Sequence, residues 1–458
     1  MKPINNEVFR TYDIRGLVDK DFDEEWVEVL GKACGTYFKK NGYDKAVIGH
    51  DCRHTSPGYQ AALASGITST GVDVITLGLV PTPVFYYAAK VLGLGGGAIV
   101  TASHNPPEFN GFKVWLGETT AHSEQIQDVF KIMESGDFAD GNGSPGSVEE
   151  LDILPRYLDE LAAQVKLTKP IKVVVDGGNG TGGEVTAELL RRVGAEVVCQ
   201  FCEPDGDFPN HHPDPVVEKY MTQLQDRVLA EGAVAGIGLD GDNDRIGVVN
   251  EKGKLMFGDQ LLAIYARKVL KQHPGTTVIG EVKCSHLLYK DIETHGGEPL
   301  MWKTGHSLIK AKMKEVDSKL AGEMSGHMFF ADRYYGFDDA TYAAMRLVEI
   351  LDGTDTPLSE MLADWPTTYN TPEIRFDCPE AVKAKVVAKA QEFFAAKYDV
   401  SLVDGVRILF PDGWALVRSS NTQPVLVLRF EAESPERLEE IRALVEKPLN
   451  EWVAEFGG

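Results

Sequence analysis

Short apolar runs rich in Val and Ile alternate with longer amphipathic stretches through the first three quarters of the chain. Apolar runs of this length predict buried strands, and the 3.6-residue periodicity between them predicts helices. Strands separated by helices form βαβ units, so we expect largely parallel sheets. The pattern restarts after a loop-like segment at 140–145 and again near Gly258. Strands are expected at 45–51, 73–80, 97–103, 171–176, 195–201 and 276–282, and helices at 56–71, 81–93, 186–194, 259–272 and 307–316.

The chain after about Thr367 has a different pattern. A helical stretch at 379–398 comes first, three strand-like runs lie between 405 and 433, and a last helical stretch covers 437–456. This order is typical of a small α+β domain. The fold class predicted is therefore α/β, with three topologically similar α/β domains plus a smaller C-terminal α+β domain. The expected boundaries are 1–147, 148–254, 255–366 and 367–458.

Composition narrows the classes of function. The 458 residues carry 46 Lys and Arg against 69 Asp and Glu, a net charge of −23, which argues against a nucleic-acid partner. No window approaches the roughly 18 apolar residues of a membrane span, and no signal peptide is recognisable at the start. Six scattered cysteines indicate a reducing compartment, so we expect a cytoplasmic protein. Cys199 and Cys202 are interpreted as buried strand thiols rather than a zinc or redox site.

A single serine, Ser103, stands where a buried strand gives way to a loop with two prolines. Ligands bind at the carboxyl ends of strands in open α/β sheets, so this hydroxyl is a candidate for chemistry. A helix-capping or turn serine is the alternative, although Asn105-Pro106-Pro107 disfavours an immediate helix. The G-x-S-x-G pattern of a hydrolytic nucleophile is absent here.

Three aspartates alternate in GIGLDGDNDRIGVV, with Arg245 directly after them. Carboxylates this close repel one another unless a cation lies among them, and Mg²⁺ or Ca²⁺ prefers oxygen ligands. An EF-hand would place Glu251 at position twelve, but its flanks read as strands and Arg245 occupies the glycine position. A solvated acidic turn is a further alternative. A metal with an adjacent arginine suits phosphoryl transfer, in which the arginine gathers developing charge.

Further polar motifs lie in loops between predicted elements. GEMSGH offers a carboxylate, a hydroxyl and an imidazole that suit sugar hydroxyls, and RSSNTQP is a plausible phosphate cradle. Each of the two is also compatible with an ordinary turn. Basic groups gather near other predicted strand ends, namely Arg10, Arg15, Lys283, Lys303 and His306. Such local concentrations would let an acidic protein bind an anionic substrate.

Together these motifs resemble the α-D-phosphohexomutase family, in its bacterial phosphomannomutase/phosphoglucomutase branch. The resemblance covers nearly the whole chain and implies four domains around a central cleft. It implies Ser103 as a catalytic serine carried as phosphoserine, with His104 and Lys113 in proton transfer or phosphate contact. Arg245, which follows the aspartates, completes the catalytic residues that we expect. The other roles that it implies are Mg²⁺ ligation by Asp240, Asp242, Asp244 and Ser103, sugar contacts by Glu323, Ser325 and His327, phosphate contacts by Arg418, Ser420, Asn421 and Thr422, and further positions along the cleft at Tyr12, Arg15, Lys283 and His306.

The expected activity is interconversion of hexose 1-phosphate and hexose 6-phosphate, with mannose or glucose as the sugar. A phosphoserine can donate its phosphoryl group, which gives a hexose 1,6-bisphosphate that then returns its other phosphoryl group. The expected cofactors are Mg²⁺ and the bisphosphate as activator, and the partners are small sugar phosphates, with the chain as a monomer or weak homodimer. A glucosamine phosphate mutase, a metal phosphatase and a non-catalytic sugar-phosphate binder are the rival interpretations.

Overall fold

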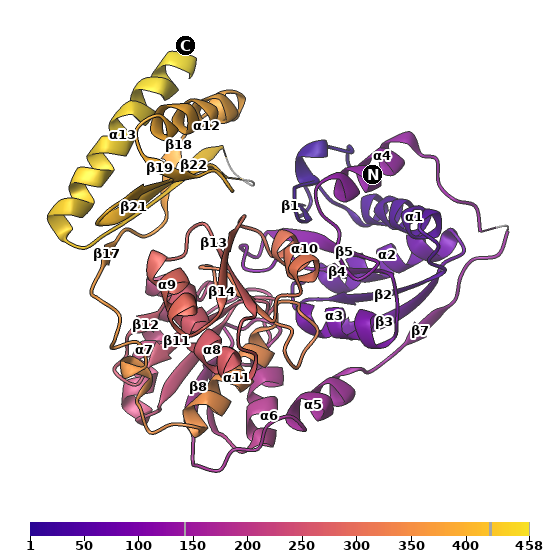
Figure 1. Ribbon diagram of the computed structural model, residues 1–458. Helices are drawn as coiled ribbons and strands as arrows, with labels where there is room; N and C mark the ends of the chain where they lie inside the picture. The colour runs from indigo at the N-terminus through magenta and orange to yellow at the C-terminus, as the bar shows by residue number, and fades with distance from the viewer. Residues whose placement is uncertain (142, 421–423, 458) are drawn as a thin grey trace.

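The computed structural model describes residues 1–141, 143–420 and 424–457, and their helices and strands form four units (Figure 1). Unit I is built on a seven-stranded sheet of order β1-β5-β4-β2-β3-β7, with β6 beside β5. Its βαβ strands β2, β3, β4 and β7 are parallel, whereas β5 runs antiparallel to both of its neighbours, β4 and β1. The elements are η1 (Asn6–Val8), β1 (Ile14–Leu17), α1 (Glu24–Lys40), β2 (Lys45–His50), α2 (Ser56–Ser69), β3 (Asp73–Leu79), α3 (Thr82–Val91), β4 (Gly96–Val100), β5 (Phe109–Leu116), β6 (Thr119–Thr120), α4 (Glu124–Ser135) and β7 (Val148–Glu150).

Apolar side chains point to both faces of the sheet of unit I, which explains why helices cover it on both sides. Side chains of successive strand residues point to opposite faces, so Ile48 and Val100 pack with α1, α2 and α4 on one side. Val47 and Ile99 face the other side, where α3 lies. Both faces are apolar, as expected for parallel strands covered by helices on each side.

Units II and III repeat this plan with smaller sheets. The sheet of unit II has the order β12-β11-β10-β8-β9, and that of unit III has the order β14-β13-β15-β16. In each sheet three strands are parallel and the remaining edge is antiparallel. Unit II comprises α5 (Leu154–Ala162), β8 (Lys172–Asp176), α6 (Gly183–Val193), β9 (Glu196–Gln200), α7 (Glu218–Glu231), β10 (Ala235–Leu239), β11 (Ile246–Asn250) and β12 (Leu255–Met256); unit III comprises α8 (Gly258–Gln272), β13 (Thr277–Glu281), α9 (His286–Thr294), β14 (Glu298–Trp302), α10 (His306–Val316), β15 (Leu320–Gly322), β16 (Met328–Phe330), α11 (Ala340–Asp352) and η2 (Leu358–Glu360).

Unit IV is a six-stranded sheet in which every strand pair is antiparallel, with two helices on one face (Figure 1). The α/β plan of the first three units and the α+β plan of the last confirm the predicted fold class. The elements of unit IV are β17 (Tyr369–Asn370), β18 (Ile374–Asp377), α12 (Glu380–Ala395), β19 (Asp399–Ser401), β20 (Val406–Phe410), β21 (Gly413–Ser419), β22 (Val425–Ala432) and α13 (Pro435–Gly457).

The apolar cores differ between the first three units and the fourth. One continuous cluster of buried side chains runs through units I, II and III, from Val47 on β2 to Val348 on α11. Unit IV has its own core around Phe394 and Trp452. It meets unit III through a small cluster that contains Val282 and Trp414. Units I–III therefore form one packed body, to which unit IV is joined by far less apolar contact.

Two details differ from the sequence interpretation. Cys199 is exposed, because β9 is the edge strand of its sheet, and only Cys202, just beyond that strand, is buried. The interpretation of both as buried strand thiols was therefore wrong for Cys199. Strand β7, which follows the expected boundary at 147, pairs with β3 and completes the sheet of unit I. None of the helices in the described ranges combines the length and hydropathy that a membrane span requires.

Candidate functional site

Ser103 follows β4 at the carboxyl end of the strand, as the sequence predicted. Its φ of 52° lies in the left-handed region, which is uncommon for a residue with a side chain. The side chain is 3% exposed, and its Oγ donates a hydrogen bond to Oδ2 of Asp240 at 2.9 Å. Nδ1 of His104 lies 3.1 Å from Oγ of Ser103. The serine of unit I therefore faces the aspartates of unit II directly.

The three aspartates occupy the turn between the antiparallel strands β10 and β11. Strands on both sides rule out the EF-hand, whose loop joins two helices. All three side chains are at most 1% exposed, so the turn is not a solvated acidic one. Oδ1 of Asp240 accepts hydrogen bonds from the backbone N–H groups of Asp244 and Arg245, at 3.0 and 3.1 Å. These bonds shape the turn so that one oxygen from each aspartate lies within 4.8 Å of the others.

Lys113 on β5 supplies a positive charge to this turn. Its Nζ donates to Oδ2 of Asp242 at 2.6 Å and to Oδ2 of Asp244 at 2.5 Å. Burial alone lowers the pKa of Lys113, but the two carboxylates outweigh burial and hold this pKa well above its usual value. Burial, followed by the charges of Asp244 and Asp242, raises the pKa of Asp240 well above its usual value.

The turn also has the donor set of a site for a hard cation. Oδ1 of Asp242 and Oδ1 of Asp244 are buried and have no hydrogen-bond partner among the described residues. A buried carboxylate oxygen without a partner is costly, and a divalent cation bound by oxygen ligands would satisfy both atoms. The described residues thus include a buried acidic group that can bind a metal ion.

The GEMSGH loop of unit III lies against this turn. Arg245 donates from Nε to Nε2 of His327 at 3.0 Å, and Nδ1 of His327 lies 3.1 Å from the backbone oxygen of Asp244. Because Nε2 accepts the bond from Arg245, Nδ1 is the ring nitrogen that can donate. Glu323 accepts a hydrogen bond from the N–H of Gly305 at 2.6 Å, and burial raises its pKa. The hydroxyl of Ser325 lies 3.5 Å from the carboxylate of Glu323.

His306, the first residue of α10, stacks on His327 with ring centroids 5.4 Å apart. Burial and the neighbouring Lys310 lower the pKa of His306 well below its usual value. Tyr12 of unit I packs edge-on against His306 and donates from its hydroxyl to the carbonyl of Thr304 at 2.8 Å. Units I and III therefore contact each other through two of the residues that the sequence singled out.

The predicted phosphate loop of unit IV is described only in part, because Asn421 and Thr422 lie outside the described residues. Arg418 on β21 is 4% exposed and donates from Nε to Asp404 at 2.9 Å. Its Nη2 has no hydrogen-bond partner within the described ranges. Ser420 is buried, and its carbonyl accepts a hydrogen bond from Lys383 at 2.8 Å.

The remaining predicted cations have separate partners or none of the contacts that the sequence suggested. Arg15 on β1 donates from Nη1 to the side-chain oxygen of Asn105 at 2.7 Å, so it contacts the loop at 101–108 that carries Ser103, here called the serine loop. Lys283 follows β13 and donates to Glu373 at 3.2 Å, across the junction of units III and IV. Arg10 does not lie in a strand, since its backbone is outside β1, and Lys303 is exposed.

Sequence reasoning missed several residues of the site. Thr82 donates from its hydroxyl to Asp242 at 2.6 Å, and Asp338 lies 3.0 Å from Nδ1 of His327. Arg53 contacts the serine loop and follows β2 at the same sheet edge as Ser103. A search for polar residues after each parallel strand would have found Arg53, because those ends share one edge. Asp338 follows no strand, so the sequence carries no comparable signal for it.

Comparison with known families covers almost the whole chain. Residues 6–140, 155–253 and 257–369 match phosphoglucomutase/phosphomannomutase alpha/beta/alpha domains I, II and III, and residues 373–447 match the C-terminal domain of the same enzymes.

Individual relatives agree with these matches. A phosphomannomutase/phosphoglucomutase of Pseudomonas aeruginosa is 43% identical over 96% of this chain and 95% of its own length. A phosphoglucomutase of Neisseria gonorrhoeae is 41% identical over 96% of both chains. A crystal structure of a phosphoglucomutase/phosphomannomutase family protein from Burkholderia thailandensis superposes with a TM-score of 0.92 at 39% identity, covering 99% of this chain and 98% of the other.

Proposed function

The chain belongs to the phosphoglucomutase/phosphomannomutase family, and we propose from this premise that it interconverts hexose 1-phosphates and hexose 6-phosphates, with mannose or glucose as the sugar. The observation that carries the mechanism is the 2.9 Å contact between Ser103 Oγ and Asp240 inside a buried acidic turn. A hydroxyl held there can carry a phosphoryl group beside a cation. Because β7 completes the sheet of unit I and β12 that of unit II, we propose domain boundaries after Glu150 and Met256 in place of 147 and 254, and we keep the third at 366.

The carboxylates of Asp240, Asp242 and Asp244, with an oxygen of phosphorylated Ser103, would hold Mg²⁺. The partnerless oxygens of Asp242 and Asp244 support this assignment. When bound, Mg²⁺ offsets phosphate charge and polarises the transferring group. Arg245, beside the turn, would stabilise the charge that spreads over the phosphoryl oxygens during transfer.

In the first half-reaction a free hydroxyl of the hexose phosphate attacks the phosphorus of phosphoserine 103. The new P–O bond joins the sugar, the P–Oγ bond breaks, and Oγ takes the electron pair. The hydroxyl proton passes to a base, for which His104 is the candidate because its ring lies beside Ser103 Oγ and burial lowers its pKa well below the usual value. Lys113, which two carboxylates hold as an ammonium group with a raised pKa, would instead contact the phosphoryl group as a cation. The hexose 1,6-bisphosphate then turns over and returns its other phosphoryl group to Ser103, which explains its use as an activator.

The non-reacting end of the substrate needs its own contacts. Arg418, with Ser420, Asn421 and Thr422, would bind the second phosphate, and the buried Nη2 of Arg418 supports this role. Glu323, Ser325 and His327 would bind sugar hydroxyls, while Tyr12, Arg15, Lys283 and His306 would line the path between the units. The separate core of unit IV supports a hinge that lets the intermediate reorient.

The deciding experiment assays mutase activity with glucose 1-phosphate, mannose 1-phosphate and glucosamine 1-phosphate in parallel, each primed with a trace of the bisphosphate. Isomer formation without phosphate release supports a mutase, and release of phosphate would instead identify a phosphatase. The Ser103→Ala variant should lose nearly all activity while remaining folded, and intact-mass measurement should detect phosphoserine only in the parent. Absence of phosphoserine 103 during turnover would overturn the mechanism.

Further substitutions test the other assignments. Asp242→Asn should weaken the dependence on Mg²⁺, and an unchanged response would move the ion elsewhere. Arg418→Ala should raise KM, and unchanged kinetics would remove the phosphate cradle. We also propose that the protein acts in the cytoplasm as a monomer or weak homodimer, which fractionation and sedimentation measurements can test.

A further inference from the structure

The guanidinium of Arg53 is surrounded by the loop that carries Ser103. Arg53 follows β2 and is 1% exposed. Its Nε donates to the carboxylate of Asp51 at 3.1 Å. Its two terminal nitrogens donate to four backbone carbonyls, those of Ser103 at 2.9 Å, Asn105 at 2.5 Å, Pro106 at 2.7 Å and Phe109 at 3.0 Å.

These contacts use the full donor capacity of the side chain. A guanidinium has five N–H groups in a rigid planar fork, and here five acceptors surround it. Three of the carbonyls, those of Ser103, Asn105 and Pro106, belong to a turning loop with two prolines, where there is no strand pairing to satisfy them. The fourth is that of Phe109, the first residue of β5. A lysine at this position would offer three donors on a flexible stem and could not replace the fork.

The loop needs such support because Ser103 adopts a φ of 52°. A left-handed backbone costs a residue with a side chain about 1–3 kcal/mol and persists only where its surroundings impose it. The N–H of Ser103 donates to the hydroxyl of Thr101 at 2.9 Å, and its carbonyl is held by Arg53. Both sides of the strained residue are therefore fixed, which fixes the direction of its side chain toward Asp240.

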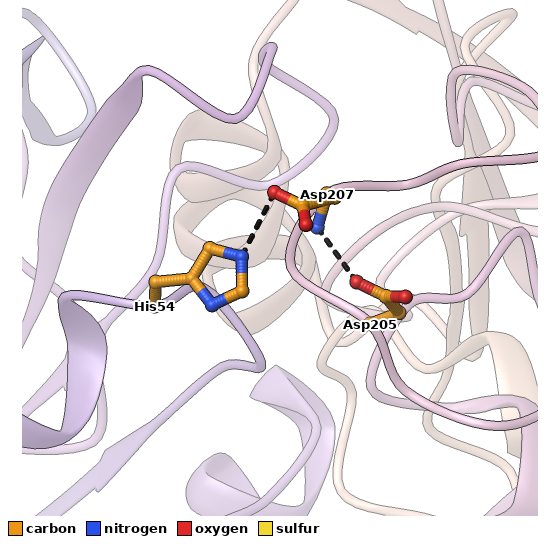
Figure 2. A group of neighbouring side chains, drawn as sticks. All are labelled: His54, Asp205 and Asp207. Atoms are coloured by element: carbon orange, nitrogen blue, oxygen red, sulfur yellow. Dashed lines mark hydrogen bonds and ion pairs between the residues drawn. The ribbon is translucent and has the colours of Figure 1, made fainter.

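Unit II closes over this arginine. The ring of Phe208 lies 5.2 Å from the guanidinium carbon of Arg53. Gly206 packs against the same turn, where a Cβ would come within 2.7 Å of the carbonyl of Cys52. Next to it, His54 pairs with Asp207 at 2.9 Å on the surface, and the N–H of Asp207 donates to Asp205 (Figure 2). Unit II, which supplies the three aspartates, therefore also packs against Arg53, the residue that holds the serine loop.

We propose that Arg53 is a positioning residue for phosphoryl transfer, which aims Ser103 Oγ at the acidic turn by binding the carbonyls of the serine loop. It acts through the backbone and contacts neither the sugar nor the phosphoryl group. This inference rests on the proposed role of Ser103 as the phosphoryl carrier. Its loss should therefore slow transfer and leave the binding of substrate by units III and IV unchanged.

The test compares the parent, Arg53→Lys, Arg53→Ala and the matched control Arg346→Lys. Arg346 lies on α11, is as buried as Arg53, and donates hydrogen bonds to Asp332 and none to the serine loop. Misplacement of a reacting group by about 1 Å can cost about 100-fold in rate, so we expect kcat of Arg53→Lys to fall by about 100-fold with KM within about threefold. The control should lose stability but keep its kcat per folded molecule.

Two additional measurements separate positioning from folding. Guanidinium at non-denaturing concentration should restore part of the kcat of Arg53→Ala and none of that lost by Ser103→Ala. Asp51→Asn, which keeps its shape but weakens the contact with Nε, should reduce kcat by about tenfold. A kcat of folded Arg53→Lys within about threefold of the parent, or equal losses for Arg53→Lys and Arg346→Lys, would overturn the proposal.

Failure of the proposed function gives a different result. The rate at which glucose 1,6-bisphosphate phosphorylates Ser103 is followed by intact mass in the parent and in Arg53→Lys. No phosphorylation of the parent would refute the carrier role itself. Rapid phosphorylation of the parent and slow phosphorylation of the variant supports the role of Arg53, and equal rates would refute that role alone.

Discussion

Replacement of Lys113 by methionine tests whether its ammonium group balances the acidic turn. The change keeps an unbranched side chain of similar length but removes the positive charge that contacts Asp242 and Asp244. With an effective dielectric constant of about 20, Coulomb's law gives about 6 kcal/mol for a contact at 2.6 Å. Most of this energy offsets the desolvation of the charges, and removal of one partner from a buried ion pair typically costs about 3–5 kcal/mol. We expect Lys113→Met to lose that much stability in EDTA.

Mg²⁺ should reverse much of this loss. A ligand at about 100 times its Kd stabilises the native state by about 2.7 kcal/mol, and without the competing ammonium the carboxylates should bind the ion more tightly. The assay is urea unfolding of parent and variant in EDTA and in Mg²⁺. Arg346→Met is the control, because Arg346 is an equally buried cation that contacts Asp332 instead, at 2.8 Å, and should gain no such recovery. If Lys113→Met in EDTA unfolds at the same urea concentration as the parent, the reasoning is refuted.

Three further predictions follow from the buried and exposed carboxylates. Burial raises the pKa of Asp339 to about 6, so the stability that its protonated form contributes is complete below about pH 4 and is lost as the pH rises through 6. The free energy of unfolding of the parent, measured relative to that of Asp339→Asn, should therefore fall by about 3 kcal/mol between pH 4 and pH 7. A difference between the two proteins that stays constant with pH would contradict this. Asp404 accepts hydrogen bonds from Arg418 and from the backbone of Thr304, so Asp404→Ala should loosen unit IV and increase the radius of gyration in X-ray scattering, whereas an unchanged radius would mean that other contacts hold the unit. The exposed His54–Asp207 pair should contribute little, and Asp207→Asn should stay within about 1 kcal/mol of the parent in urea unfolding; a larger loss would show that the pair does more than surface ion pairs usually do.

The amino-acid sequence by itself determined the local structure and the kinds of chemistry available. Hydrophobic periodicity located the βαβ units, and the change in the order of predicted helices and strands near Thr367 predicted the α+β unit. The serine at the end of β4 and the aspartates between β10 and β11 were predicted at the right places, since a strand end and a turn are local features. Motif combinations also sufficed to identify the family.

Only the tertiary structure decided which side chains meet. Ser103 and Asp240 are 137 residues apart and touch because units I and II pack on a shared core. The contact of Lys113 with the acidic turn and that of Arg53 with the serine loop depend equally on packing. Periodicity reports the burial of a residue but carries no information about its partner, so a buried lysine or arginine reads in the sequence as a surface charge. The exposure of Cys199 was missed for the same reason, because strand order, which makes β9 an edge, is set by the assembled sheet.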